Sequence, residues 1–205
     1  MPKRSLFLTA LASSLLALAC LPAASASEGS PADQAFLTRA AAAGSAEVAL
    51  GQLALQKTSS PQTRQLAQHI VSDHTKANEQ LVALARQKQI TVAPEPDAAA
   101  KQKLDKLQKL DGDAFDRTYA QDMVKDHQQA IALFTKASAS ATDNDVKQFA
   151  AQTLPVLKDH LQMAQQLRRA GRDEMQGPAT PRSPMQEMPS STQPPPSSGP
   201  PSNGH

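Results

Sequence analysis

The sequence repeats one four-residue pattern, which consists of an aliphatic residue, any residue, Asp and His. The three copies end at His74, His127 and His160, and these are three of the five histidines in the chain. Imidazole nitrogen binds zinc, copper and iron, and a nearby carboxylate can orient the ring. The repeated pattern therefore indicates histidines that act together from three separate segments of the chain.

Each of these histidines lies on the apolar stripe of a segment with helical periodicity. A helix advances about 100° per residue, and His74, His127 and His160 fall among apolar positions spaced by three and four residues. Glu47 lies in the middle of the stripe of an earlier segment. Counting about 1.5 Å per residue from the predicted turns puts Glu47, His74 and His127 at similar depth, with His160 about one turn away. Four ionisable side chains, one from each long helix, are therefore expected to point inward.

Three interpretations of this inward cluster remain open. Glu47 and the three histidines form a suitable ligand set for one zinc, copper or iron ion. Alternatively, they form a structural network in which Glu47 pairs with one histidine and the others satisfy each other, which would fix the register of the helices. The third interpretation is a small-molecule cavity. The metal site is the favoured hypothesis, because burying four ionisable groups without a ligand is costly.

The aspartates that precede the histidines are expected to have a supporting role. Asp73, Asp126 and Asp159 point about 100° away from the histidines that follow them. We therefore expect each of them to orient a neighbouring imidazole or to form a salt bridge between helices, rather than to bind the same ion.

The elements that position these residues are predicted to be four long helices. Ser30 and Ser60, each followed by Pro, mark two helix starts, and Thr142-Asp143-Asn144 caps another. Pro155 is expected to kink the last helix, which should end near Gly171. The predicted helices cover residues 31–57, 61–88, 113–140 and 144–171, with a short helix at 98–109. The fold class is all-α, an up-down-up-down four-helix bundle over residues 31–171.

Composition supports a helical protein and excludes several classes of function. Only 3% of the 205 residues are aromatic, none is Trp, and the single cysteine rules out an intrachain disulfide. Lys3 and Arg4 account for the excess of 21 basic over 19 acidic residues, so the rest of the chain is balanced. We therefore expect no nucleic-acid partner. A lysine-rich stretch at 101–109 is expected to be a solvent-exposed helix face.

Residues 1–26 have the pattern of a bacterial signal peptide. Lys3 and Arg4 precede an apolar stretch, and Ala24-Ser25-Ala26 forms the cleavage site. The protein is therefore expected to be exported to the periplasm, with no transmembrane segment in the mature chain. Cys20 also follows Leu18-Ala19 as in a lipobox, so lipidation of Cys20 and anchoring in the outer membrane is the alternative.

The C-terminal segment, residues 172–205, is predicted to be a disordered tail. Its last 29 residues hold nine Pro and six Ser, a composition that cannot bury enough apolar surface to fold. Elsewhere the chain has no Cys-x-x-Cys-His, phosphate loop, dinucleotide fingerprint or nucleophile elbow. These absences exclude covalently attached haem, predict no nucleotide cofactor, and favour a protein that is not an enzyme.

Four blocks of sequence resemble the bacterial family known as domain of unknown function 4142, whose members are often labelled outer membrane proteins. The blocks lie at residues 46–54, 71–78, 115–127 and 153–160, and the resemblance covers about 33–167. It implies a ferritin-like bundle and an exported protein, but no established activity. Di-iron bundles use Glu-x-x-His, whereas Val71, Val124 and Leu157 stand three residues before these histidines. A mononuclear, nitrogen-rich site is therefore the better form of the metal hypothesis.

Overall fold

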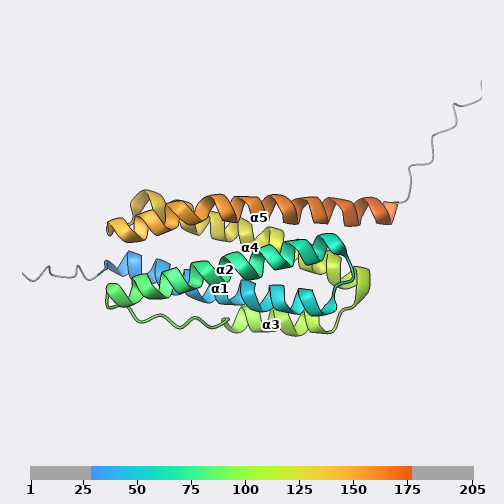
Figure 1. Cartoon of the computed structure of the whole chain (residues 1–205), viewed down its shortest axis with the longest axis horizontal. Helices are drawn as coiled ribbons and strands as arrows, with labels where there is room; N and C mark the ends of the chain where they lie inside the picture. The colour runs from blue at the N-terminus through green and yellow to red at the C-terminus, as the bar shows by residue number, and fades with distance from the viewer. Residues whose placement is uncertain (1–28, 177–205) are drawn as a thin grey trace, which may run out of the picture.

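The structure, a computed structural model, describes residues 29–176 (Figure 1). The predicted signal peptide with Cys20 lies outside the described residues, as do residues 177–205 of the tail that was predicted for 172–205. Within the described range the chain forms helices and no strands, which confirms the all-α prediction. The helices are α1 (Pro31–Lys57), α2 (Pro61–Gln87), α3 (Ala98–Gln108), α4 (Gly112–Ser140) and α5 (Asn144–Gln176).

Helix boundaries follow the local signals of the sequence, with one exception. The side chains of Ser30 and Ser60 accept hydrogen bonds from backbone N–H groups three residues later, at 3.1 and 3.2 Å, so both predicted N-caps are confirmed. The predicted end of α5 near Gly171 is wrong, because the helix continues to Gln176. A Cβ on Gly171 would lie 3.2 Å from Cγ of Arg117, so this glycine serves a close contact with α4 rather than a helix end.

The four long helices pair as two hairpins, but their directions differ from the prediction. Lys57, at the end of α1, forms a 2.8 Å ion pair with Asp111 at the start of α4. The hydroxyl of Thr58 donates to Asp116 at 2.6 Å. Because α2 and α4 both start at this end, the long helices run up-down-down-up, and the up-down-up-down prediction is wrong (Figure 1). The extended segment after α2 and the helix α3 together return the chain along the bundle before α4 begins.

At the opposite end, a group of polar side chains ties the start of α1 to the α4–α5 turn. Asp33 accepts hydrogen bonds from the backbone N–H and the hydroxyl of Thr142 and from the N–H of Asp143. Asp143 also forms a 2.8 Å ion pair with Lys88 at the end of α2. We call Asp33, Lys88, Thr142 and Asp143 the end cluster.

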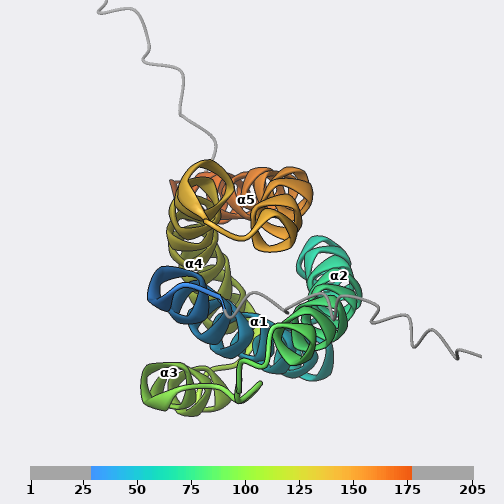
Figure 2. The ribbon, with the colours of Figure 1, turned by 90° about the vertical axis from the view of Figure 1, so that its left-hand side faces the viewer.

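The apolar core consists of two clusters, one toward each end of the bundle. The first contains the three-ring group of Phe36, Phe134 and Phe149, and the second contains Ile70, Tyr119 and others. The helix α3 lies outside the bundle alongside α1 (Figure 2). Between the two apolar clusters lies a layer that contains buried polar side chains from α1, α2, α4 and α5, namely Glu47, His74, His127 and His160.

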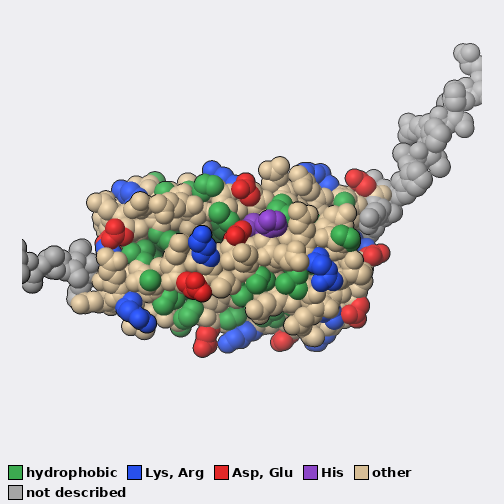
Figure 3. Space-filling model, viewed as in Figure 1, with side chains coloured by type: hydrophobic (Ala, Val, Ile, Leu, Met, Phe, Trp, Pro, Cys, Tyr) green, Lys and Arg blue, Asp and Glu red, His purple; other side chains and the backbone are tan. Residues whose placement is uncertain are grey.

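The outer surface carries charges of both signs. On the face shown in Figure 3, basic and acidic side chains alternate rather than gather into a patch of one sign. None of the helices in residues 29–176 is both long and apolar enough to cross a membrane.

Candidate metal centre

The three histidines of the repeated pattern meet in the polar layer of the bundle. His74 from α2, His127 from α4 and His160 from α5 each offer a ring nitrogen, and these atoms all lie within 4.8 Å of one another. All three side chains are buried. His160 was expected about one turn away, but the structure brings it into the group. We call these three residues the histidine triad.

Outward hydrogen bonds determine where two of the rings carry their protons. Nδ1 of His127 lies 2.9 Å from the carbonyl oxygen of Met123, which can only accept, so Nδ1 is the donor. Nε2 of His160 lies 3.0 Å from a carboxylate oxygen of Asp73, so Nε2 donates in the same way. In neutral rings, the remaining nitrogens, Nε2 of His127 and Nδ1 of His160, then carry lone pairs rather than protons.

These two lone-pair nitrogens face each other at 3.3 Å. No hydrogen bond can form between two acceptors, whereas a cation between them would satisfy both. Two nitrogens bound to one tetrahedral metal at 2.0–2.1 Å are about 3.3 Å apart, which matches the observed separation. Nε2 of His74 is also buried, with no hydrogen-bond partner in the described part of the chain. His127 and His160 thus present two unsatisfied nitrogens with the spacing that a metal ion requires, and the buried nitrogen of His74 lies within 4.8 Å of them.

Electrostatics keep the triad in the form that binds metal. Burial, reinforced by the neighbouring rings, lowers the pKa of His74 to about 3. The same causes lower the pKa of His127 to about 4, and burial also lowers the pKa of His160 although Asp73 opposes it. At neutral pH the three rings are therefore uncharged, and a metal ion does not have to displace protons from them.

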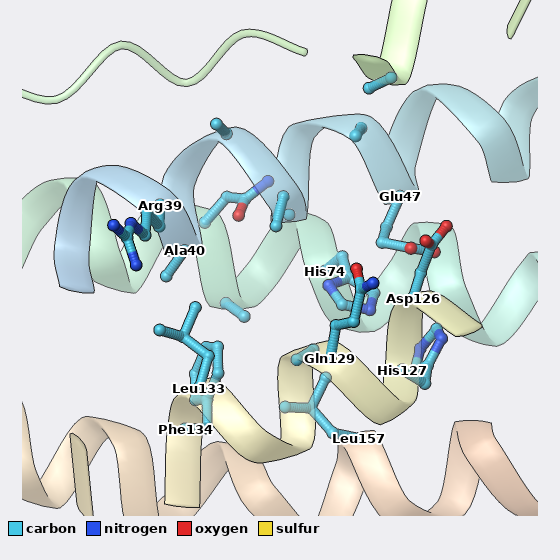
Figure 4. A pocket seen from close by; sticks show the side chains of 18 of the residues that line it. Arg39, Ala40, Glu47, His74, Asp126, His127, Gln129, Leu133, Phe134 and Leu157 are labelled. Carbon is cyan, nitrogen blue, oxygen red and sulfur yellow. The ribbon is translucent and has the colours of Figure 1, made fainter. Parts of the chain in front are cut away.

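Glu47 lies in the same layer but is not one of the converging ligands. The atoms within 4.8 Å of one another come from the histidines alone. Burial, with the nearby Asp126, raises the pKa of Glu47 to about 8, and its Oε2 has no hydrogen-bond partner among the described residues. Figure 4 shows the carboxyl groups of Glu47 and Asp126 close to each other. Ligation by Glu47 therefore stays a prediction.

The three aspartates of the repeated pattern have different surroundings. Asp73 on α2 holds His160 on α5, which is the expected role between helices. Asp126 forms an ion pair with Lys103 of α3. Asp159 is exposed on α5. The pattern is thus repeated in sequence, but its copies are not equivalent in space.

Two residues near the site were missed by sequence reasoning. Lys103 lies in the lysine-rich stretch that was expected to face solvent, yet it is partly buried and reaches Asp126. Tyr119 is fully buried with an unpartnered hydroxyl, and burial together with Glu47 raises its pKa. Its position on the apolar stripe was a detectable signal, whereas nothing local distinguished Lys103 from its neighbouring lysines.

A cavity of about 700 Å³ borders the triad (Figure 4). His74 and His127 line it, and His160 does not. One part of its wall is polar, with Glu47 and Asp126. Most of the remainder is apolar and includes Leu50, Leu81, Phe134, Phe149 and Leu157.

The fold and this site define an all-helical bundle with a buried cluster of three histidines. The chain belongs to the family described as domain of unknown function (DUF4142), whose profile matches residues 18–167. A comparison with curated proteins finds no match.

Several solved structures share the fold. A DUF305 fragment from Deinococcus radiodurans superposes with a TM-score of 0.61 at 18% identity, covering 69% of this chain and 98% of that one. A DUF305 protein from Streptomyces coelicolor superposes with a TM-score of 0.60 at 16% identity, covering 69% of this chain and 94% of that one. CopM in its Cu(I)-bound form superposes with a TM-score of 0.59 at 18% identity, covering 67% of this chain and 96% of that one. At these identities the likeness concerns the fold alone.

Proposed function

We propose that this protein binds one transition metal ion, copper, through His74, His127 and His160. The observation that carries the proposal is the 3.3 Å separation of two ring nitrogens that both lack a proton. Such an arrangement is unfavourable without a cation, and the outward bonds to Met123 and Asp73 hold it in place. Hydrogen bonds of this kind are typical of metal-bound histidines.

Copper is favoured over zinc and iron for two reasons. Copper(II) binds nitrogen ligands more tightly than the other divalent ions of its row. In addition, CopM, which shares the fold, has been solved with Cu(I) and with Cu(II) bound. The proposed role is to bind copper for storage, sensing or modest redox work, and it does not require enzyme activity.

The proposed location is the bacterial envelope. The signal-peptide pattern of residues 1–26 supports export to the periplasm, with an outer-membrane lipid anchor at Cys20 as the alternative. The DUF305 protein from Streptomyces coelicolor that shares the fold is described as a "putative secreted protein", which is consistent with export. The ferritin-like assignment is also part of the proposal, since one long crossover in a four-helix bundle is the connection used by that class.

Elemental analysis of residues 27–205, purified from the periplasm without a His-tag, tests the proposal. We expect about one equivalent of copper per chain and loss of the metal in His127→Ala. The matched control is His69→Ala, which changes an exposed histidine of α2 and should keep the metal. A folded wild-type protein that takes up no transition metal, even when copper is supplied, would leave only a structural network.

A further inference from the structure

The cavity beside the triad has the properties of a ligand-binding site. Its volume of about 700 Å³ lies within the range of small-molecule pockets. Exposed residues such as Arg39, Lys125 and Gln129 contribute to its lining, so it reaches the surface of the protein. A molecule can therefore enter without unfolding the bundle.

An ion held by the three histidines alone would have room for one more ligand. Sites that use metal only for structure are closed by four protein ligands, whereas three protein ligands leave a position for an exogenous molecule. Three nitrogens converge here, and two of the three histidines line the cavity. An ion held by the triad is therefore accessible from the cavity.

A second observation points to an occupant. Glu47 is only 7% exposed and lines the cavity, and its Oε2 has no partner among the described residues. A buried polar atom without a partner costs free energy that a bound molecule could recover. Phe134, Phe149 and Leu157 also line the cavity and offer apolar surface.

We propose that the cavity binds a small molecule with an apolar body and one nitrogen or sulfur donor atom, and that the donor completes the coordination of the ion. This inference rests on the proposed copper binding. The apolar wall selects the body of the molecule, the ion selects its donor atom, and Glu47 contacts a polar group if the molecule carries one.

Imidazole and 4-phenylimidazole are the probes, titrated into the copper(II)-loaded protein and followed by visible absorption and electron paramagnetic resonance. Both present the same donor atom, but only the second has a large apolar body. We expect 4-phenylimidazole to bind at least about tenfold more tightly, because its phenyl ring leaves water. Equal affinities, or no spectral change with either probe, would contradict the proposal.

A substitution that fills the cavity tests whether 4-phenylimidazole binds there. Ala77 lines the cavity on α2, one turn after His74, so Ala77→Phe should weaken 4-phenylimidazole binding at least about tenfold while one copper remains bound. Ala77→Leu is the milder variant if the Phe variant does not fold. Ala83→Phe is the control, since Ala83 is exposed on the same helix and does not line this cavity.

The outcomes separate the two proposals. Unchanged probe binding in both Ala77 variants would place the ligand elsewhere and overturn the inference. Loss of copper during the titration, measured after gel filtration, would also overturn it. If the wild type binds one copper but no probe, the copper proposal stands and this inference fails. If the wild type binds no copper, both fail.

Discussion

Two polar groups of this protein, the end cluster and the layer that holds the histidine triad, differ in whether their buried atoms have hydrogen-bond partners. In the end cluster, Asp33 accepts three hydrogen bonds, and Asp143 accepts from two backbone N–H groups and pairs with Lys88. In the middle of the bundle, Oε2 of Glu47 and Nε2 of His74 have no partner in residues 29–176, and two lone pairs face each other.

The difference distinguishes structural groups from a binding site. A satisfied network stabilises the connection between helices and needs nothing else. An unsatisfied one costs stability in the free protein, and it persists where a ligand compensates. The following predictions test whether this division is correct.

The largest expected effect is stabilisation of the protein by copper. With free copper at about 1,000 times its dissociation constant, binding adds about 4 kcal/mol to the free energy of unfolding. Because the triad supplies the binding, His160→Ala should lose this increment. Thermal unfolding with and without copper measures it. A copper-dependent increase of the same size in His160→Ala would show that copper binds elsewhere.

Removing Asp33, the central acceptor of the end cluster, should lower the free energy of unfolding by nearly as much as copper raises it. Asp33→Ala removes the acceptor for the hydroxyl and N–H of Thr142 and for the N–H of Asp143. We expect the free energy of unfolding to fall by about 3 kcal/mol. Urea denaturation measures the loss, and copper stoichiometry should not change. Asp113→Ala is the control, because Asp113 is exposed and its ion pair with Arg117 is long, at 4.0 Å, so its loss should have little effect on stability. Loss of copper in Asp33→Ala would break the proposed separation of the two groups.

A smaller effect is expected from the residue that orients the triad. Asp73→Asn weakens the hydrogen bond that holds Nε2 of His160, and copper affinity should fall about 10- to 100-fold. Competition with a chelator measures the affinity. Asp159→Asn is the matched control, since Asp159 belongs to the same sequence pattern but is exposed. Equal effects of the two substitutions would contradict a specific role for Asp73.

The smallest expected effect concerns the pH dependence of the metal-free protein. The pKa of Glu47 rises from 4.5 to about 8 on folding, so between these values the unfolded chain releases a proton that the folded chain keeps. The free energy of unfolding therefore falls as pH rises through this window. Glu47→Gln removes this contribution.

We expect the free energy of unfolding of Glu47→Gln to increase relative to that of the wild type as the pH rises from 4.5 to 8. At pH 8 the difference in the free energy of unfolding should reach about 1.4 kcal/mol, the free energy of one pKa unit. The triad affects both proteins alike, so its own titration cancels in the difference. Urea denaturation at several pH values measures the effect, and a difference that does not vary with pH would show that burial does not hold Glu47 neutral.

Much of the local structure could be predicted from the sequence. The N-caps at Ser30 and Ser60 and the inward direction of His74, His127 and His160 depend on residues within a turn or two, so periodicity was sufficient. The end of α5 could not be predicted in this way, because the contact of Gly171 with Arg117 comes from another helix.

The amino-acid sequence alone determined where the long helices begin and which face of each is apolar, since both follow from local capping and the 3.6-residue period. Tertiary structure alone decided that α4 runs parallel to α2, because that depends on how far α3 carries the chain. It also decided that Asp73 holds His160 while Asp159 is exposed. The proton of His127 is positioned by Met123 of the same helix, whereas the proton of His160 is positioned by Asp73 of another helix. The two lone-pair nitrogens therefore face each other only when the bundle is assembled.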